Sequence, residues 1–123
     1  MEDSFSDLAE LEGNLSRYLT ILVGTWTMGA MMEEMVFRGY LINRLQDLFL
    51  KGERRAAIPV IFSALLFGFA HAVFTPIFVI LTFLQGVLLG SLYIYCRKNL
   101  WFSIIAHGTG ITARIPLALF GMY

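Results

Sequence analysis

The chain has 123 residues, enough for a single domain, and 58% of them are hydrophobic, well above the roughly 45–50% typical of soluble globular proteins. Lysine and arginine together number 9, as do aspartate and glutamate, so the formal net charge is zero and no basic surface suited to nucleic acid is expected. Cys96 is the single cysteine, which excludes an internal disulfide.

The chain opens with the polar, acidic stretch MEDSFSDLAELEGN. This stretch lacks the basic start and the small-residue cleavage site of a signal peptide. The sequence therefore predicts a solvated tail or a surface helix over residues 1–14, followed by a membrane-embedded helical core over residues 15–123.

A long helix is expected from about Leu15 to Leu50. Its part from Tyr18 to Met32 carries no charged residue, and apolar residues continue to Leu50 after a charged cluster. A helix of this length exceeds what a bilayer requires, so one end is expected to project from the membrane or to turn along its surface.

Two further helices are expected in the segment Ala56–Cys96, which contains no Asp, Glu, Lys or Arg. The segment is long enough for two transmembrane helices of about 20 residues each. Thr75-Pro76 lies near its middle, and proline favours the first turn of a helix. The sequence thus predicts one span over Ala56–Phe74 and another over Pro76–Cys96. In water, so short a chain could not form a core large enough to cover both apolar helices.

The last apolar segment, Leu100–Met122, is interrupted by Arg114 and Pro116. With this segment the sequence predicts an all-α, polytopic membrane bundle of about four transmembrane helices. Five of the 9 basic residues fall in two short loops, at 51–55 and 97–98, that are separated by two spans. The positive-inside rule places both loops in the cytoplasm and makes the protein an integral, multi-pass membrane protein.

The stretch GAMMEEMVFRGYL places three charged residues inside an apolar run. Glu34 and Arg38 are four apart and can pair on one helix face, while Glu33 is offset from Glu34 by about 100°. An ionisable group inside a membrane helix is costly and normally faces a bundle interior or a water-filled cavity. The cluster is therefore a candidate functional site, with a structural ion pair near the headgroups as the alternative.

The two histidines of the chain, His71 in LLFGFAHAVF and His107 in FSIIAHGTGIT, also lie in apolar segments. Either one alone would more often be a hydrogen-bonded core residue. Together with a buried pair of glutamates they form a more specific set. A carboxylate can take a proton from a water molecule while imidazoles orient that water or stabilise the charge on an attacked carbonyl.

The order and spacing of these residues resemble the CPBP family of intramembrane proteases. This family includes the type II CAAX prenyl endopeptidases and the bacterial bacteriocin-immunity proteins. The likeness spans about Gly24 to Ala113. The residues that carry it are EExxxR (Glu33, Glu34, Arg38), FxxxH (Phe67, His71) and the histidine of a further helix (His107).

The resemblance implies a membrane hydrolase that cleaves peptide bonds, on prenylated C-a-a-X-type or other membrane-associated peptides and proteins. It implies that Glu33 is the general base, supported by Glu34 and Arg38. His71 would position the attacking water, and His107 would stabilise the oxyanion. The bacterial members of the family favour a location in a bacterial plasma membrane.

One position departs from the family pattern, because Ile111 stands where the third motif usually has Asn or Asp. Thr109 or Thr112 would substitute only if the helix is irregular, which the neighbouring glycines permit. Without a substitute the activity would be low or absent. A catalytically silent scaffold or bacteriocin-immunity factor is therefore the alternative function, and a transport subunit with a proton relay is a further one.

Metal dependence is the remaining question, because the family is often labelled as metalloprotease-like. Two histidines and a glutamate match a catalytic zinc site with an open position. However, the HExxH motif is absent and the candidate ligands come from three helices. We therefore favour a mechanism that requires no cofactor. Since family members usually have more helices, we also expect a truncated bundle, for which a second copy of the chain could cover exposed polar faces.

Overall fold

The computed structural model describes residues 15–49 and 54–119, and every element within them is a helix, which confirms the predicted all-α class. The predicted tail over residues 1–14 lies outside the described residues. The elements in chain order are α2 (Leu15–Gly24), η1 (Thr25–Met32), η2 (Met35–Ile42), α3 (Asn43–Phe49), α4 (Arg54–Ala70), α5 (Pro76–Tyr95) and α6 (Leu100–Leu119).

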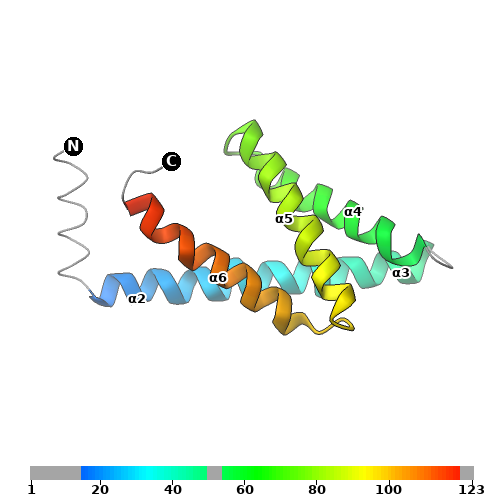
Figure 1. Ribbon diagram of the computed structural model, residues 1–123, viewed down its shortest axis with the longest axis horizontal. Helices are drawn as coiled ribbons and strands as arrows, with labels where there is room; N and C mark the ends of the chain where they lie inside the picture. Colours follow the sequence, from blue (N-terminus) through cyan, green and yellow to red (C-terminus); the bar gives the residue numbers. More distant parts are fainter. Residues whose placement is uncertain (1–14, 50–53, 120–123) are drawn as a thin grey trace.

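The first four elements, from α2 to α3, join end to end into one rod that runs the length of the molecule (Figure 1). This rod agrees with the long helix expected from Leu15 to Leu50. Its two central segments, η1 and η2, have π-helical hydrogen bonding, which the sequence did not indicate. Glu33 and Glu34 lie at the junction between them, and π-helical turns frequently accompany functional sites.

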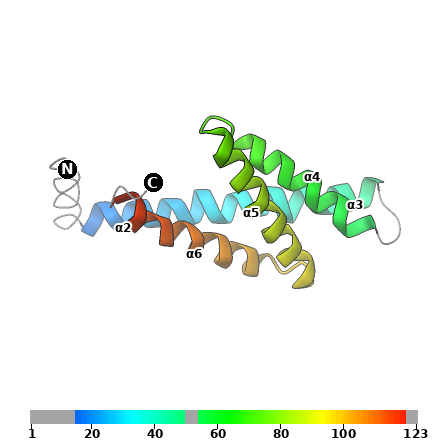
Figure 2. The same ribbon diagram turned by 45° about the horizontal axis from the view of Figure 1, so that its top comes forward.

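Helices α4 and α5 form an antiparallel hairpin that crosses the C-terminal half of the rod (Figures 1 and 2). As predicted, α5 begins at Pro76, and Thr75 caps it by accepting a hydrogen bond from Phe78 N at 3.3 Å. The preceding helix ends at Ala70 rather than Phe74. His71 therefore lies in a turn, where its N–H donates to Gly68 O at 3.0 Å.

Small residues let α4 and α5 pack closely. A Cβ added at Gly86 would lie 2.9 Å from Ala64 Cα, and one added at Gly90 would lie 2.9 Å from Val60 Cγ1. Carbon atoms do not approach so closely, so both positions require glycine. This is the packing by small residues that stabilises helix pairs in membranes.

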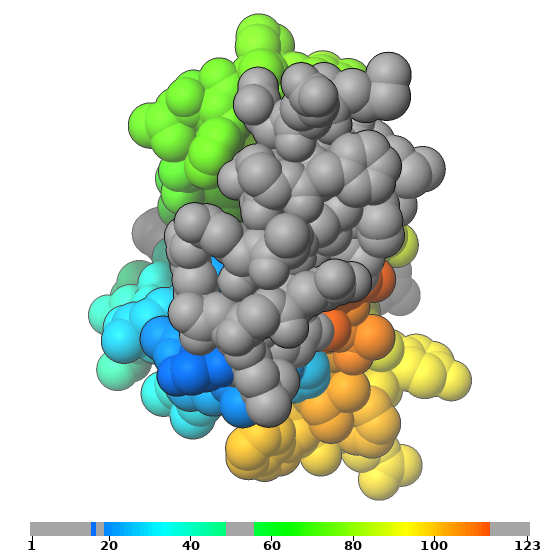
Figure 3. All heavy atoms as spheres, turned by 90° about the vertical axis from the view of Figure 1, so that its left-hand side faces the viewer, coloured from blue at the N-terminus to red at the C-terminus, as the bar shows by residue number. Residues whose placement is uncertain are grey.

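A tight turn after α5 sends the chain back along the rod. Arg97 and Lys98 have positive φ angles of 55° and 62°, and Lys98 N donates to Tyr93 O at 2.8 Å. Helix α6 then runs beside η1, so that residues far apart in the sequence lie side by side (Figure 2). Seen end-on, the α4–α5 turn lies at the top of the molecule and the α5–α6 turn at the bottom right (Figure 3).

Within the described residues, one helix is both long and apolar enough to cross a membrane. It is Pro76–Tyr95, with a mean hydropathy of 2.2, and 28% of its apolar window is buried inside the molecule. Ala56–Ala70 is equally free of charge but shorter. The predicted number of four spans is therefore not confirmed, since the rod carries charged residues within its apolar stretch.

Candidate active site

The two glutamates at the centre of the rod have different surroundings. Glu34 is completely buried, whereas the side chain of Glu33 is 31% exposed. The helix is continuous between them, with Glu33 N–H shared between Ala30 O and Gly29 O. Two adjacent carboxylates thus point in different directions, one into the protein and one toward an accessible space, as the 100° offset between neighbours requires.

Glu34 is held by the ion pair expected from its spacing to Arg38. Arg38 Nη1 donates to Glu34 Oε1 at 2.9 Å, and Arg38 Nη2 donates to the carbonyl oxygen of Gly86 at 3.3 Å. The guanidinium also lies 4.6 Å from the ring centre of Phe67. The contacts with Gly86 and Phe67 join the rod to α5 and α4, around an ion pair whose two charges are both buried.

His107 on α6 lies between the two glutamates. Its Nδ1 is 2.8 Å from Glu34 Oε1, and its Nε2 is 3.8 Å from Glu33 Oε2. Because the carboxylate of Glu34 is the acceptor, Nδ1 carries the proton and Nε2 is left facing Glu33. The separation of 3.8 Å is too long for a direct hydrogen bond and suits a shared water molecule.

His71 reaches the same cluster from the α4–α5 turn. Its Nδ1 donates to Phe67 O at 2.8 Å, since a carbonyl oxygen only accepts, so Nε2 of the neutral ring is an acceptor. The ring packs on Phe67 with centroids 4.8 Å apart, and Phe67 in turn lies 5.9 Å from His107. Phe67 thus packs against both imidazoles.

The structure therefore gathers all the predicted site residues, although not by equal contacts. Glu33, Glu34, Arg38 and His107 form a continuous chain of ion pairs and hydrogen bonds. His71 joins them through the ring of Phe67, which lies 4.8 Å from the His71 ring and 5.9 Å from the His107 ring, centroid to centroid.

The position that departs from the family pattern is filled by apolar packing. A Cβ added at Gly29 would lie 3.3 Å from Ile111 Cδ1, so this side chain rests on the rod one turn before Glu33. Neither threonine replaces the missing polar group. Thr109 is exposed and donates to Ile105 O at 2.7 Å, and Thr112 donates to Gly108 O at 2.8 Å. The condition for such a substitution, an irregular helix, is not met, because α6 is a regular helix here.

Two contributors to the site were missed by sequence reasoning. The carbonyl of Gly86 could not be found because a backbone acceptor leaves no signature in the side-chain pattern. Trp26 carries an indole N–H donor within an apolar stretch, seven residues before Glu33, and its Nε1 donates to Thr112 Oγ1 at 3.0 Å. Its spacing of two helical turns was the available signal.

A zinc site was weighed as an alternative from the sequence. A catalytic zinc needs three protein ligands and an open position. Among the described residues, no group of three His, Cys, Asp or Glu side chains could hold a metal ion. His107 Nδ1 and Glu34 Oε1 are occupied by each other, and Glu34 Oε1 also accepts from Arg38.

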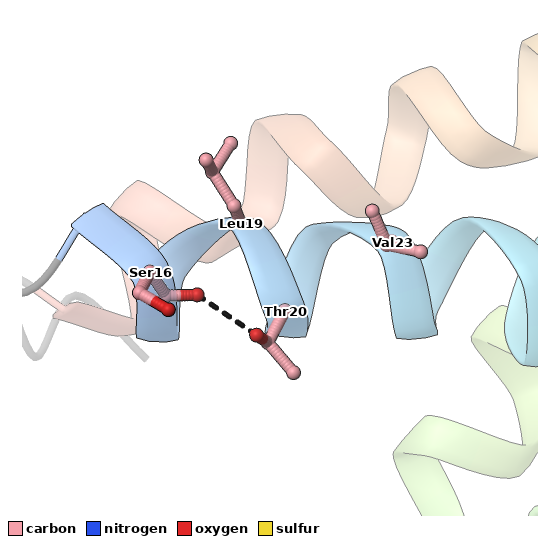
Figure 4. A pocket seen from close by; sticks show the side chains of 4 residues that line it. All are labelled: Ser16, Leu19, Thr20 and Val23. Atoms are coloured by element: carbon pink, nitrogen blue, oxygen red, sulfur yellow. Dashed lines mark hydrogen bonds between the residues drawn. The ribbon is translucent and has the colours of Figure 1, made fainter.

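A hollow on the surface of α2 lies apart from this cluster. It is lined by Ser16, Leu19, Thr20 and Val23 of the one helix, and the Thr20 hydroxyl donates to Ser16 O at 2.8 Å (Figure 4). It contains no acid, base or nucleophile beyond these hydroxyls. Its nearest residue is about 15 Å along the rod from Glu33 at 1.5 Å per residue. The hollow therefore has no part in the candidate active site.

The fold and the site define a helical protein in which a polar cluster of acid, base and guanidinium is enclosed by largely apolar helices. Residues 15–110 match the family described as type II CAAX prenyl endopeptidase Rce1-like, and the chain belongs to this family. This confirms the resemblance seen in the sequence. The family is membrane-embedded and consists of proteases that act on peptides. No curated protein and no solved structure matches the chain.

Proposed function

We propose that the protein is a multi-pass intramembrane endopeptidase that hydrolyses a peptide bond with a water molecule activated by Glu33. The observation that carries the proposal is the position of His107, with one ring nitrogen on Glu34 and the other 3.8 Å from Glu33. Membership of the Rce1-like family supports a prenylated C-a-a-X-type peptide as the first substrate to test.

In the proposed reaction, a water molecule lies between Glu33 Oε2 and the imidazole nitrogens. Glu33 takes one proton from this water while the water oxygen forms a bond to the carbonyl carbon of the substrate. The electron pair of the C=O double bond moves to the carbonyl oxygen. The intermediate then collapses, the C–N bond breaks, and the amine leaves with the proton returned from Glu33. The products are a carboxylic acid and an amine.

The two histidines are given different tasks by their hydrogen bonds. The neutral ring of His71 offers Nε2 as an acceptor for the second proton of the water, since its Nδ1–H is committed to Phe67. His107 can stabilise the oxyanion only through Nε2–H, which requires the imidazolium form because Nδ1–H is committed to Glu34. A positive His107, together with Arg38, would balance the two carboxylates.

The experiment is a cleavage assay of the purified full chain in nanodiscs. Substrates are a fluorogenic prenylated C-a-a-X peptide and an unprenylated membrane peptide. Glu33→Gln is expected to lower turnover by about 10²–10⁴-fold, the usual contribution of a general base. The matched control is Asp47→Asn, the same change at an exposed carboxylate on α3, which is expected to leave turnover within about twofold of wild type.

Equal cleavage by wild type and Glu33→Gln would refute the mechanism. The absence of cleavage of either substrate by a folded wild-type protein would favour a catalytically silent member, consistent with the apolar packing of Ile111 against Gly29.

We also propose that the loops at 51–55 and 97–98 face the cytoplasm. Labelling of Lys98→Cys in sealed spheroplasts by an impermeant thiol reagent tests this orientation, with Cys96 replaced by serine.

A further inference from the structure

Trp26 lies against the backbone of α6 beside the candidate active site. A Cβ added at Gly108 would lie 2.7 Å from both Cε3 and Cζ3 of the indole and 2.8 Å from Cδ2. Carbon atoms of side chains do not approach this closely, so the indole can take this place only because residue 108 is glycine. Gly108 directly follows His107.

The polar edge of the same indole is also fixed. Trp26 Nε1–H donates to Thr112 Oγ1 at 3.0 Å, and the Thr112 hydroxyl donates to Gly108 O at 2.8 Å. The indole therefore spans one turn of α6, with its ring on Gly108 and its N–H on Thr112. The polar groups of Trp26 and Thr112 bond to each other and to Gly108 O rather than to the glutamates or the imidazoles, so both residues act at a distance from the reacting atoms.

A small rotation of α6 about its axis would change the direction in which His107 points. Consecutive residues are about 100° apart around a helix, and side chains reach about 5–6 Å from its axis. A rotation of α6 by about 10° would therefore move the imidazole by about 1 Å. The ring has contacts at 2.8 Å with Glu34 and 3.8 Å with Glu33, so a shift of this size would break one contact or close the gap that a water needs.

We propose that Trp26 and Thr112 are positioning residues, which hold α6 on the rod through Gly108 so that His107 bridges the two glutamates. The inference rests on the proposed function for its kinetic consequence but not for its structural one. A displacement of about 1 Å at a catalytic group can cost about 10²-fold in rate. Loss of this contact should therefore lower turnover while leaving substrate affinity largely intact.

The test compares Gly108→Ala with Gly110→Ala. Both place a methyl group on α6, but nothing lies within 4 Å of a Cβ at Gly110, whereas at Gly108 it would displace the indole. Gly108→Ala is expected to lower kcat by about 10- to 100-fold with KM within about twofold, and Gly110→Ala to change neither. Trp26→Phe keeps a ring and removes the N–H donor, so it should lower kcat by a smaller factor.

A second readout does not depend on activity. The chain has 2 histidines, so ¹⁵N-labelled histidine gives a simple spectrum that His71→Gln assigns. The Nδ1–H signal of His107 is expected to move in Gly108→Ala and Trp26→Phe but to stay in place in Gly110→Ala and Trp101→Phe. Trp101 is 63% exposed and serves as the matched control for the ring.

The outcomes separate the two proposals. If wild type cleaves no substrate but the His107 signal moves as expected, the proposed function fails and the positioning of His107 is supported. If Gly108→Ala matches Gly110→Ala in both kcat and His107 signal, the positioning role is overturned. Should Gly108→Ala fail to fold, the variants Trp26→Phe and Thr112→Val test the positioning role instead. Each should shift the Nδ1–H signal of His107, and the double variant should shift it no further than either single variant.

Discussion

The buried ion pair at the centre of the rod provides a sharp test of how this site is held together. Arg38→Met removes the donor to Glu34 Oε1 at 2.9 Å, the donor to Gly86 O at 3.3 Å and the cation over Phe67. The variant leaves the carboxylate of Glu34 completely buried without its main counter-charge. Removing one partner of such a pair typically costs about 3–5 kcal/mol, and we expect a loss of unfolding free energy in this range.

The double variant Glu34→Gln/Arg38→Met separates the two sources of this loss. It removes the buried charge, and a glutamine oxygen can still accept from His107 Nδ1, the bond that is 2.8 Å long in the wild type. We expect the double variant to be more stable than Arg38→Met alone, with a coupling of about 2–3 kcal/mol between the two positions. Neutral replacement of a buried pair is often tolerated for this reason.

The assay is reversible unfolding in mixed micelles, followed by tryptophan fluorescence at increasing denaturing detergent. Arg44→Met is the matched control on the same helical rod, because Arg44 is exposed and its guanidinium lies 5.8 Å from the Tyr40 ring. It should cost less than about 1 kcal/mol. A loss of under about 1 kcal/mol in Arg38→Met, or strict additivity in the double variant, would refute the view that these charges depend on each other.

Three further outcomes follow from the same contacts. Gly86→Ala should destabilise the protein by about 1–3 kcal/mol in the same unfolding assay, because its methyl group would lie 2.9 Å from Ala64 Cα. The control Gly24→Ala should leave the stability unchanged, because nothing lies within 4 Å of a Cβ at that position. Ile111→Asn should raise kcat about tenfold or more by adding a polar group beside Gly29. An unchanged or lower kcat would contradict the view that the missing polar group at position 111 limits turnover. A chelator should leave cleavage unchanged, because the proposed reaction activates its water with Glu33 alone. Inhibition reversed by added zinc would overturn the metal-free mechanism.

The sequence alone determined where the helices lie along the chain and which local contacts form within them, although not the π-helical turns of the rod or the end of α4 at Ala70. Thr75 and Pro76 fixed the start of α5 because capping and the restricted φ of proline act over a single turn. The pairing of Glu34 with Arg38 followed from helical spacing, since residues four apart share a face in any helix. The family resemblance came from the same kind of information, namely the order of short motifs along the chain.

Only the tertiary structure decided how separate helices meet. The bond between Glu34 and His107 joins residues 73 positions apart, and its existence depends on the rotation of α6 about its own axis. That rotation is set by which side chains fit at the crossing, such as the indole of Trp26 on Gly108. Helical periodicity repeats every 3.6 residues within one segment, but it contains nothing about the depth or rotation of a neighbouring helix. Interhelical packing supplies both.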